Sequence, residues 1–272
     1  MLFEYFKAFV LGVVEGLTEF LPVSSTGHLI LATELLGFNA EKWAAFNVII
    51  QLGAILAIVV LYWRTFWAVL EGLVHGKAVS WRFVRNILIA FLPSAILGFI
   101  LIKRIEALLG NAYVVAVALI VGGIAIIVIE KFAKRADVVG IAELPASTAV
   151  GIGVAQCLAM VPGVSRSGAT IMGALSLGVE RRTAAEFSFF LAVPTMVGAT
   201  TLEFVKHRHE LLAGASGVGF GTVAVGFMVS FVVALIVVRA FVHYISRHGF
   251  APFAWYRIAA GAAALVWLGL GH

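Results

Sequence analysis

The chain has 272 residues, of which 62% are hydrophobic and only 12% are charged, and its mean hydropathy is +1.08. A soluble domain is about half apolar and about a quarter charged, so this composition excludes an ordinary soluble domain and indicates an integral membrane protein. The net charge of +5 fits cytoplasmic loops and lipid headgroups. Because we find no basic cluster and no nucleic-acid-binding motif, we expect no nucleic-acid partner.

The first apolar region, residues 2–37, contains the polar stretch EGLTEFLPVSSTGH at residues 15–28. A helical run of about 15 residues leads to Pro22, where a helix ends, and a Ser or Thr after the break can cap a second short helix. The pattern predicts a re-entrant helix–break–helix hairpin that enters and leaves the membrane on one side. Irregular backbone at membrane depth persists only where it is buried in protein or lines a wet cavity.

Three transmembrane helices are predicted next, at residues 44–63, 86–102 and 112–130. Each is close to the roughly 20 mostly apolar residues that cross a bilayer. A charged stretch at 64–85 separates the first two spans and another, at 131–143, follows the third, and we expect both stretches to be loops.

The second half of the chain repeats this order. Residues 146–178 again show a helical run, a break at Pro162 in VPGVSRSGAT and a second run. Aligning Pro22 with Pro162, and then allowing for one inserted residue, places Gly27 on Gly168. Three further spans follow, at 184–202, 217–238 and 252–271.

We therefore predict an all-α integral membrane protein with six transmembrane helices and two re-entrant hairpins. Residues 1–272 form a single membrane domain built from two repeats, about 1–135 and 142–272. Because each repeat has three spans, an odd number, the second repeat has inverted topology. Inverted repeats with broken helices place the working site near the midplane, where we expect the two breaks to meet.

The orientation follows from Lys and Arg in the loops, which favour the cytoplasmic side. With both termini outside, eleven of these residues lie inside and six lie outside. Arg257, near the end of a span, is expected to reach the surface by snorkelling. The inside set is Arg64, Lys77, Arg82, Arg85, Lys131, Lys134, Arg135, Arg181, Arg182, Arg239 and Arg247, and the outside set is Lys7, Lys42, Lys103, Arg104, Lys206 and Arg208.

Glu15 and Glu19 are spaced i, i+4, so their carboxylates lie on one face of the first helical run. An ionisable residue at membrane depth costs at least ~2.5–3.5 kcal/mol, which makes a functional site the default interpretation. Two such carboxylates repel each other unless a cation lies between them. We expect that cation to be Arg166, a divalent metal or both. The alternative is a glutamate pair at a wet helix end.

Ser24, Ser25 and His28 follow the first break within one helical turn. A histidine that close to a hydroxyl can act as its base. The alternative is that the serines only cap the helix and that His28 is an interior histidine with satisfied hydrogen bonds.

The second break predicts an anion site. Successive amides at a helix start, hydroxyls and one guanidinium group suit phosphate. Thr170 either adds a further hydroxyl or bonds its own helix backbone. The alternative is a capped turn from which Arg166 reaches an interface. The predicted cradle contains Ser165, Arg166, Ser167, Gly168 and Thr170.

Two carboxylates, a Ser/His pair and an Arg-containing anion cradle together suit phosphoryl transfer from a phosphate carried by a lipid. We expect the lipid tail to stay between helices while the phosphate enters a cavity open to the outer face. The rival hypothesis is a transporter or flippase of a phosphorylated lipid, because inverted repeats with broken helices are common in transporters. Release of inorganic phosphate without any gradient across a membrane distinguishes the enzyme from the transporter.

EGLTEFLPVSSTGH resembles the glutamate-rich signature of the undecaprenyl-diphosphate phosphatases of the bacitracin-resistance type, and PGVSRSGAT at 162–170 resembles their second signature. The resemblance extends over essentially the whole chain, including EFSFFLAVP at 186–194. It implies a multi-pass enzyme of the bacterial inner membrane that removes the terminal phosphate of a C55 isoprenyl diphosphate and recycles the carrier lipid for cell-wall synthesis. It also implies stimulation by Mg²⁺ or Ca²⁺ and bacitracin resistance, and it admits a homodimer.

The resemblance carries roles onto matching residues of this chain. It implies that Glu15 and Glu19 bind metal or position water, and that Arg166 clamps the diphosphate. Ser25 is then the nucleophile or a phosphate ligand and His28 the base or acid, and which of the two attacks phosphorus is open. The remaining substrate-binding residues are Ser24, Ser165, Ser167, Gly168 and Thr170.

Overall fold

The computed structural model describes residues 2–35, 40–109, 111–133, 138–212 and 219–270. All regular elements among these residues are helices, apart from an isolated bridge between Val138 and Val179. In chain order they are α1 (Leu2–Thr18), α2 (Ser25–Leu35), α3 (Ala40–Leu61), α4 (Trp63–Val74), α5 (Ala78–Leu109), α6 (Ala112–Phe132), the 3₁₀ helix η1 (Ile141–Glu143), α7 (Ala146–Gln156), the 3₁₀ helix η2 (Cys157–Met160), α8 (Arg166–Ser176), α9 (Arg181–Leu212), α10 (Phe220–Ile245) and α11 (Ala251–Gly269).

Five of the described helices are long and apolar enough to cross a bilayer, namely α5, α6, α9, α10 and α11. A sixth span is formed when Phe46–Leu61 and Trp63–Val74, which meet at a bend of 69°, are taken as one broken span. This confirms the predicted all-α membrane protein. The helices α5 and α9 extend beyond the predicted spans 86–102 and 184–202 at both ends.

The prediction of a loop at 64–85 is wrong, because this stretch forms most of α4 and the first turns of α5. Four large apolar side chains of α4, Trp63, Trp67, Leu70 and Val74, are exposed on a single stripe. A helix with an apolar stripe and a charged face is stable at the membrane interface, so charged residues in a sequence do not exclude a helix there.

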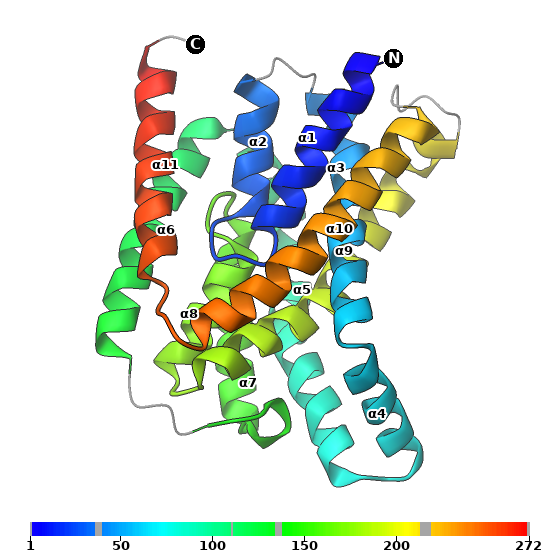
Figure 1. The fold of residues 1–272 in the computed structure, drawn as a ribbon, viewed down its shortest axis with the longest axis vertical. Helices are drawn as coiled ribbons and strands as arrows, with labels where there is room; N and C mark the ends of the chain where they lie inside the picture. Colours follow the sequence, from blue (N-terminus) through cyan, green and yellow to red (C-terminus); the bar gives the residue numbers. More distant parts are fainter. Residues whose placement is uncertain (1, 36–39, 110, 134–137, 213–218, 271–272) are drawn as a thin grey trace.

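Both predicted hairpins have the expected helix–break–helix form. The first joins α1 to α2 through residues 19–24, and the second joins α7 and η2 to α8 through residues 161–165. Figure 1 shows the first hairpin entering from the end where α11 finishes and the second entering from the opposite end, near α4. The bridge between Val138 and Val179 ties together the two segments at the base of the second hairpin.

Small residues let each hairpin pack closely on a long helix. On α1, a Cβ added at Gly16 would lie 2.7 Å from the carbonyl oxygen of Ser230 on α10. On α7, a Cβ added at Gly153 would lie 2.9 Å from the Cα of Ala90 on α5. Close backbone approach through small residues is a common basis of helix association in membranes. It holds each hairpin at a defined depth against its neighbour.

We expect Gly16→Leu to destabilise the protein by about 1–3 kcal/mol, because the added side chain meets backbone that cannot move aside. Thermal unfolding of the purified variant measures this. Gly269→Leu is the matched control, since nothing lies within 4 Å of a Cβ at that position. Equal melting temperatures of the two variants would contradict the close packing of α1 on α10.

The two termini bear on the predicted orientation. The helix α1 begins and α11 finishes at the same end of the molecule (Figure 1). Of the residues used for the charge count, Lys134 and Arg135 lie outside the described residues, and the side chains of Lys42, Lys206 and Arg208 are not described.

Candidate functional site

The two breaks contact each other in the centre of the molecule. The Ser167 hydroxyl, at the start of α8, donates a hydrogen bond of 2.7 Å to the carbonyl oxygen of Leu21 in the first break. The ring of Phe20 packs edge-on against Phe189 of α9, with 5.4 Å between their centroids. Polar groups at membrane depth are therefore buried in protein, as such a backbone requires.

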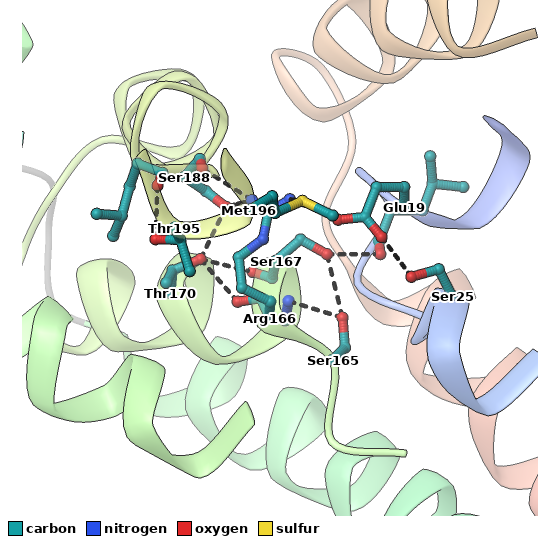
Figure 2. A network of polar contacts seen from close by, with 12 residues as sticks. Glu19, Ser25, Ser165, Arg166, Ser167, Thr170, Ser188, Thr195 and Met196 are labelled. Carbon is teal, nitrogen blue, oxygen red and sulfur yellow. Dashed lines mark hydrogen bonds and ion pairs between the residues drawn. The ribbon is translucent and has the colours of Figure 1, made fainter. Parts of the chain in front are cut away.

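An ion pair joins the hairpins. Arg166 Nη2 lies 2.7 Å from Glu19 Oε1; the Glu19 side chain is buried and the Arg166 side chain is partly buried. The hydroxyl of Ser25 donates a hydrogen bond to the other carboxylate oxygen, Oε2. Figure 2 shows Glu19 between these two groups, which come from opposite hairpins. Arg166, one of the two cations expected beside the carboxylates, thus pairs with Glu19.

Ser188 on α9 supports the guanidinium group from the other side (Figure 2). Arg166 Nη1 donates to the Ser188 carbonyl oxygen at 2.8 Å and to its hydroxyl at 3.3 Å. The Thr170 hydroxyl lies 2.7 Å from the same hydroxyl and 2.9 Å from the backbone carbonyl oxygen of Arg166, and its single proton can be donated to either. Sequence reasoning did not select Ser188, although it lies in the EFSFFLAVP stretch.

We expect Ser188→Ala to lower activity by roughly tenfold or less, because the backbone carbonyl still holds Arg166 after one hydrogen bond of about 1–1.5 kcal/mol is lost. The loss should fall mainly on KM if Arg166 binds the substrate anion. Steady-state kinetics of the purified variant measure it, with Ser176→Ala, an exposed hydroxyl at the end of α8, as the control. A loss as large as that of Arg166→Ala would contradict this supporting role.

Two serines hold strained backbone at equivalent positions of the breaks. Ser24 has φ of 74° and Ser165 has φ of 79°, a region that non-glycine residues rarely adopt and that often marks functional sites. Each hydroxyl accepts a hydrogen bond from the amide three residues on, that of Gly27 at 3.3 Å and that of Gly168 at 3.0 Å. The two turns thus place the N-termini of α2 and α8 at the breaks.

A cavity of about 550 Å³ lies against this cluster. Its polar end is formed by Glu19, Ser24, Ser25, Ser165 and Arg166, and its walls come from η2 and the second halves of α5 and α9. Both helices run from the α4 end toward the end where α1 begins, so the cavity lies in that half of the molecule (Figure 1). The apolar residues of its wall include Phe91, Phe99, Ile102, Ile105, Met160 and Leu202.

Three predicted cradle residues do not line this cavity. Ser167, Gly168 and Thr170 are buried behind Arg166, where their bonds to Leu21, Ser165 and Ser188 hold the second break in place. They hold the second break, and with it Arg166, in place without lining the cavity.

His28 is not brought to the cluster. Its Nδ1 lies 2.7 Å from the Ser24 carbonyl oxygen and its Nε2 lies 2.7 Å from the hydroxyl of Tyr256 on α11, whose ring stacks on the imidazole. Ser25 bonds Glu19 instead of His28. The i, i+3 spacing therefore placed the two side chains on one helix without placing them against each other.

Glu15 is fully buried, and neither carboxylate oxygen has a hydrogen-bond partner among the described residues. No group of three or more His, Cys, Asp and Glu side chains gathers in the part of the chain that the structure describes. The carboxylates of the site are Glu15, whose oxygens are unpaired among the described residues, and Glu19, whose oxygens are bonded by Arg166 and Ser25. This set fits Mg²⁺, which binds through one or two carboxylates and takes substrate phosphate and water as its other ligands.

The prediction that Arg257 snorkels to the surface is wrong, because this side chain is fully buried. Its guanidinium group donates to the carbonyl oxygens of Pro22 in the first break and of Gly163 and Val164 in the second, each at 2.9 Å. It also bonds two carbonyls of α6. A guanidinium group has five N–H donors in one plane, so it can bond several carbonyls at once. Arg257, on α11, therefore links both breaks to α6.

Fold and site together define an integral membrane protein with a buried carboxylate–arginine–serine cluster at the polar end of an apolar-walled cavity. The family described as bacitracin resistance protein BacA matches residues 8–263, so the chain belongs to this family. This confirms the resemblance seen in the two signatures.

Curated relatives cover almost the whole chain. A protein of Novosphingobium aromaticivorans is 68% identical over 97% of both chains. Proteins of Rhizorhabdus wittichii and Sphingopyxis alaskensis are each 57% identical over 95% of this chain and 96% of their own. All three are named undecaprenyl-diphosphatase.

Proposed function

We propose that this chain is a membrane phosphatase that hydrolyses undecaprenyl diphosphate to undecaprenyl phosphate and inorganic phosphate. The observation that carries this proposal is the cluster of Glu19, Ser25 and Arg166 at the polar end of the cavity. The names of the relatives support it. The reaction recycles the carrier lipid for cell-wall synthesis, and it confers bacitracin resistance because it consumes the diphosphate that bacitracin sequesters.

The cavity suits both parts of such a lipid. The diphosphate binds at the polar end, where Arg166 presents a guanidinium group and the N-termini of α2 and α8 favour an anion. The isoprenyl chain lies along the apolar walls, which Phe99 and Ile102 of α5 and Leu202 of α9 provide. Phe99 and Leu202 are also exposed on the outside, so the tail passes from the cavity into the bilayer between α5 and α9.

Ser25 is the nucleophile in this proposal, because its hydroxyl proton already points to a carboxylate. The substrate phosphate competes with Glu19 for Arg166, which leaves Glu19 to accept the proton as Ser25 Oγ bonds to the terminal phosphorus. The bond from this phosphorus to the bridging oxygen breaks, and undecaprenyl phosphate leaves with the proton that Glu19 had accepted. Glu19, ionised again, then deprotonates a water that hydrolyses the phosphoserine, and this proton passes to Ser25 Oγ as inorganic phosphate leaves. Arg166 stabilises the charge on the phosphoryl oxygens in both steps.

A divalent metal, Mg²⁺ or Ca²⁺, would be held by Glu15 and Glu19. It would neutralise charge on the diphosphate. Burial of both carboxylates and the unpaired oxygens of Glu15 support this assignment.

We place the enzyme in the bacterial inner membrane with the cavity open to the periplasmic face. The cavity lies in the half of the molecule where α1 begins, and the charge count of the loops puts that end outside. Inorganic phosphate then leaves on the outer side. The homodimer stays a prediction that cross-linking of the purified protein would test.

The inverted repeat stays part of this proposal, and three features support it. The breaks carry equivalent strained serines, the hairpins enter from opposite ends, and α1 packs on α10 as α7 packs on α5. Such a repeat is also compatible with alternating access, so a transporter of a phosphorylated isoprenoid lipid is the second candidate. The hydrogen bond from the Ser25 hydroxyl to the Glu19 carboxylate favours chemistry over transport, because it pairs a nucleophile with a base.

The test is release of inorganic phosphate from undecaprenyl diphosphate by the purified protein in detergent, with and without Mg²⁺ or Ca²⁺. We expect release without any gradient, and a loss of roughly 10³–10⁶-fold in Ser25→Ala if that hydroxyl is the nucleophile. Ser94→Ala, which removes another hydroxyl from the cavity wall, is the control. If folded wild-type protein releases no phosphate with any metal, the transporter replaces the phosphatase, and a lipid-flipping assay in vesicles follows.

A further inference from the structure

A second hollow lies at the opposite end of the molecule from the cavity. It has a volume of about 560 Å³ and is formed by the end of α3, the start of α9 and the last turns of α10. These segments lie at the end of the molecule where α4 and the start of α5 are found (Figure 1). Six of its lining residues are polar, namely Tyr62, Arg182, Arg239, His243, Ser246 and Arg247.

The polar lining consists of three guanidinium groups, one imidazole and two hydroxyls, and none of the described lining residues carries a carboxylate. Arg239 and His243 lie four residues apart on one face of α10, and Arg247 follows four residues later, in the turn just after the end of this helix. Arg182 is bonded to Glu186 at 2.9 Å. The side chains of Arg239 and Arg247 make no hydrogen bond or ion pair with any residue that the structure describes, so their charge is not neutralised within the described chain.

Like charges around one hollow repel each other, and an anion placed among them removes that cost. The preference of Lys and Arg for one side of a membrane accounts for charge at this end, but it does not require the charges to surround a hollow between helices. Basic pockets between membrane helices bind the headgroups of anionic lipids. Guanidinium groups suit phosphate because they form paired, charge-assisted hydrogen bonds.

The surroundings suit a lipid. Val238, Val242 and Leu61 form the apolar part of the lining. Val232 and Ile236, which precede Arg239 on α10, are exposed apolar side chains. An acyl chain along this helix would leave its phosphate at the level of the arginines.

We propose that this hollow is a second anion site, distinct from the cavity at the hairpin tips, and that it binds the phosphate group of an anionic phospholipid in the leaflet at that end. The site does not depend on hydrolysis, so it goes beyond the proposed function.

Native mass spectrometry of the full chain in detergent tests the site. The probes are phosphatidic acid and phosphatidylcholine with identical acyl chains. We expect bound phosphatidic acid in the wild type and about 25-fold weaker binding in the double variant Arg239→Gln/Arg247→Gln, since each charge near the surface contributes about fivefold. The control pair Lys77→Gln/Lys131→Gln removes the same charge from exposed positions at the same end and should bind like the wild type.

The Arg166→Ala variant distinguishes this site from the cavity, and we expect it to keep phosphatidic acid bound. Millimolar inorganic phosphate distinguishes the two sources of the anion. Failure to displace phosphatidic acid supports the lipid, whereas full displacement would assign the site to free phosphate and overturn the lipid. The site itself would be overturned by an equal loss of phosphatidic acid binding in the control pair or by a loss of that binding in Arg166→Ala. Equal binding of phosphatidylcholine and phosphatidic acid would overturn it too. Melting temperatures confirm that each variant is folded.

Discussion

Replacing Arg166 with Ala is expected to lower phosphate release by roughly 10²–10³-fold or more, the loss seen when one preorganised donor to a developing anion is removed. Arg166 is the one guanidinium group that lines the cavity, within the described chain, and it also pairs with Glu19. The variant therefore loses the substrate clamp and leaves a buried carboxylate without its cation. Steady-state phosphate release from undecaprenyl diphosphate measures the effect, together with a melting temperature, because an unpaired buried charge also destabilises the fold.

Arg166→Lys keeps the prediction testable if the Ala variant does not fold. A Lys keeps the charge beside Glu19 but cannot reach both Glu19 and Ser188 with a planar fork. We expect this variant to fold and to remain strongly impaired, mainly in kcat. Arg181→Ala, which removes an exposed guanidinium paired with Glu130, should retain activity and is the control. Wild-type kcat/KM in folded Arg166→Ala would refute the role of this residue as the clamp.

Replacing Arg257 with Met is expected to give the largest loss of stability. The carbonyl oxygens of Pro22, Gly163 and Val164 have no other hydrogen-bond partner among the described residues. Each buried carbonyl left unpaired costs about 1–3 kcal/mol. At about 2–4 °C for each kcal/mol, the melting temperature should fall by roughly 6–12 °C or more. Thermal unfolding of the purified variant in detergent measures this.

Arg64→Met is the control for this effect, because Arg64 is an exposed arginine at the start of α4 and its loss should change stability by at most about 0.5 kcal/mol. Arg257→Lys should lie between the wild type and Arg257→Met, since an ammonium group on a flexible stem satisfies fewer of the carbonyls. A melting temperature of Arg257→Met equal to that of the control would show that the breaks do not depend on this residue.

Local patterns predicted the parts of the site that lie within a few residues of each other. The break at Pro22, the start of α2 and the shared face of Glu15 and Glu19 all follow from helix geometry and from the conformations that proline permits. The pairing of Glu19 with Arg166 was also predictable, because burying a charge in a membrane requires a counter-charge and the two breaks are the polar points of their hairpins.

Contacts between distant helices were not predictable in this way. His28 shares a helix with Ser25, but its ring turns to Tyr256, which is 228 residues away in the chain. The role of Ser188 depends on how α9 passes behind Arg166. Arg257 looked like a snorkelling residue because it is near the end of a span, and only the packing of α11 against α6 and both breaks buries it.

The sequence by itself determined the class of protein, most of the helical segments and the family. Hydrophobicity and proline act locally, and the two family signatures are read directly from the residues. It missed α4, where charged residues suggested a loop. Only the tertiary structure decided which side chains form the cluster at the cavity. A helix fixes where a side chain starts and not which neighbour it meets, and in a membrane interior each buried polar group takes the partner that packing brings within reach. For Ser25 this partner is Glu19, and for Arg257 it is the backbone of both breaks.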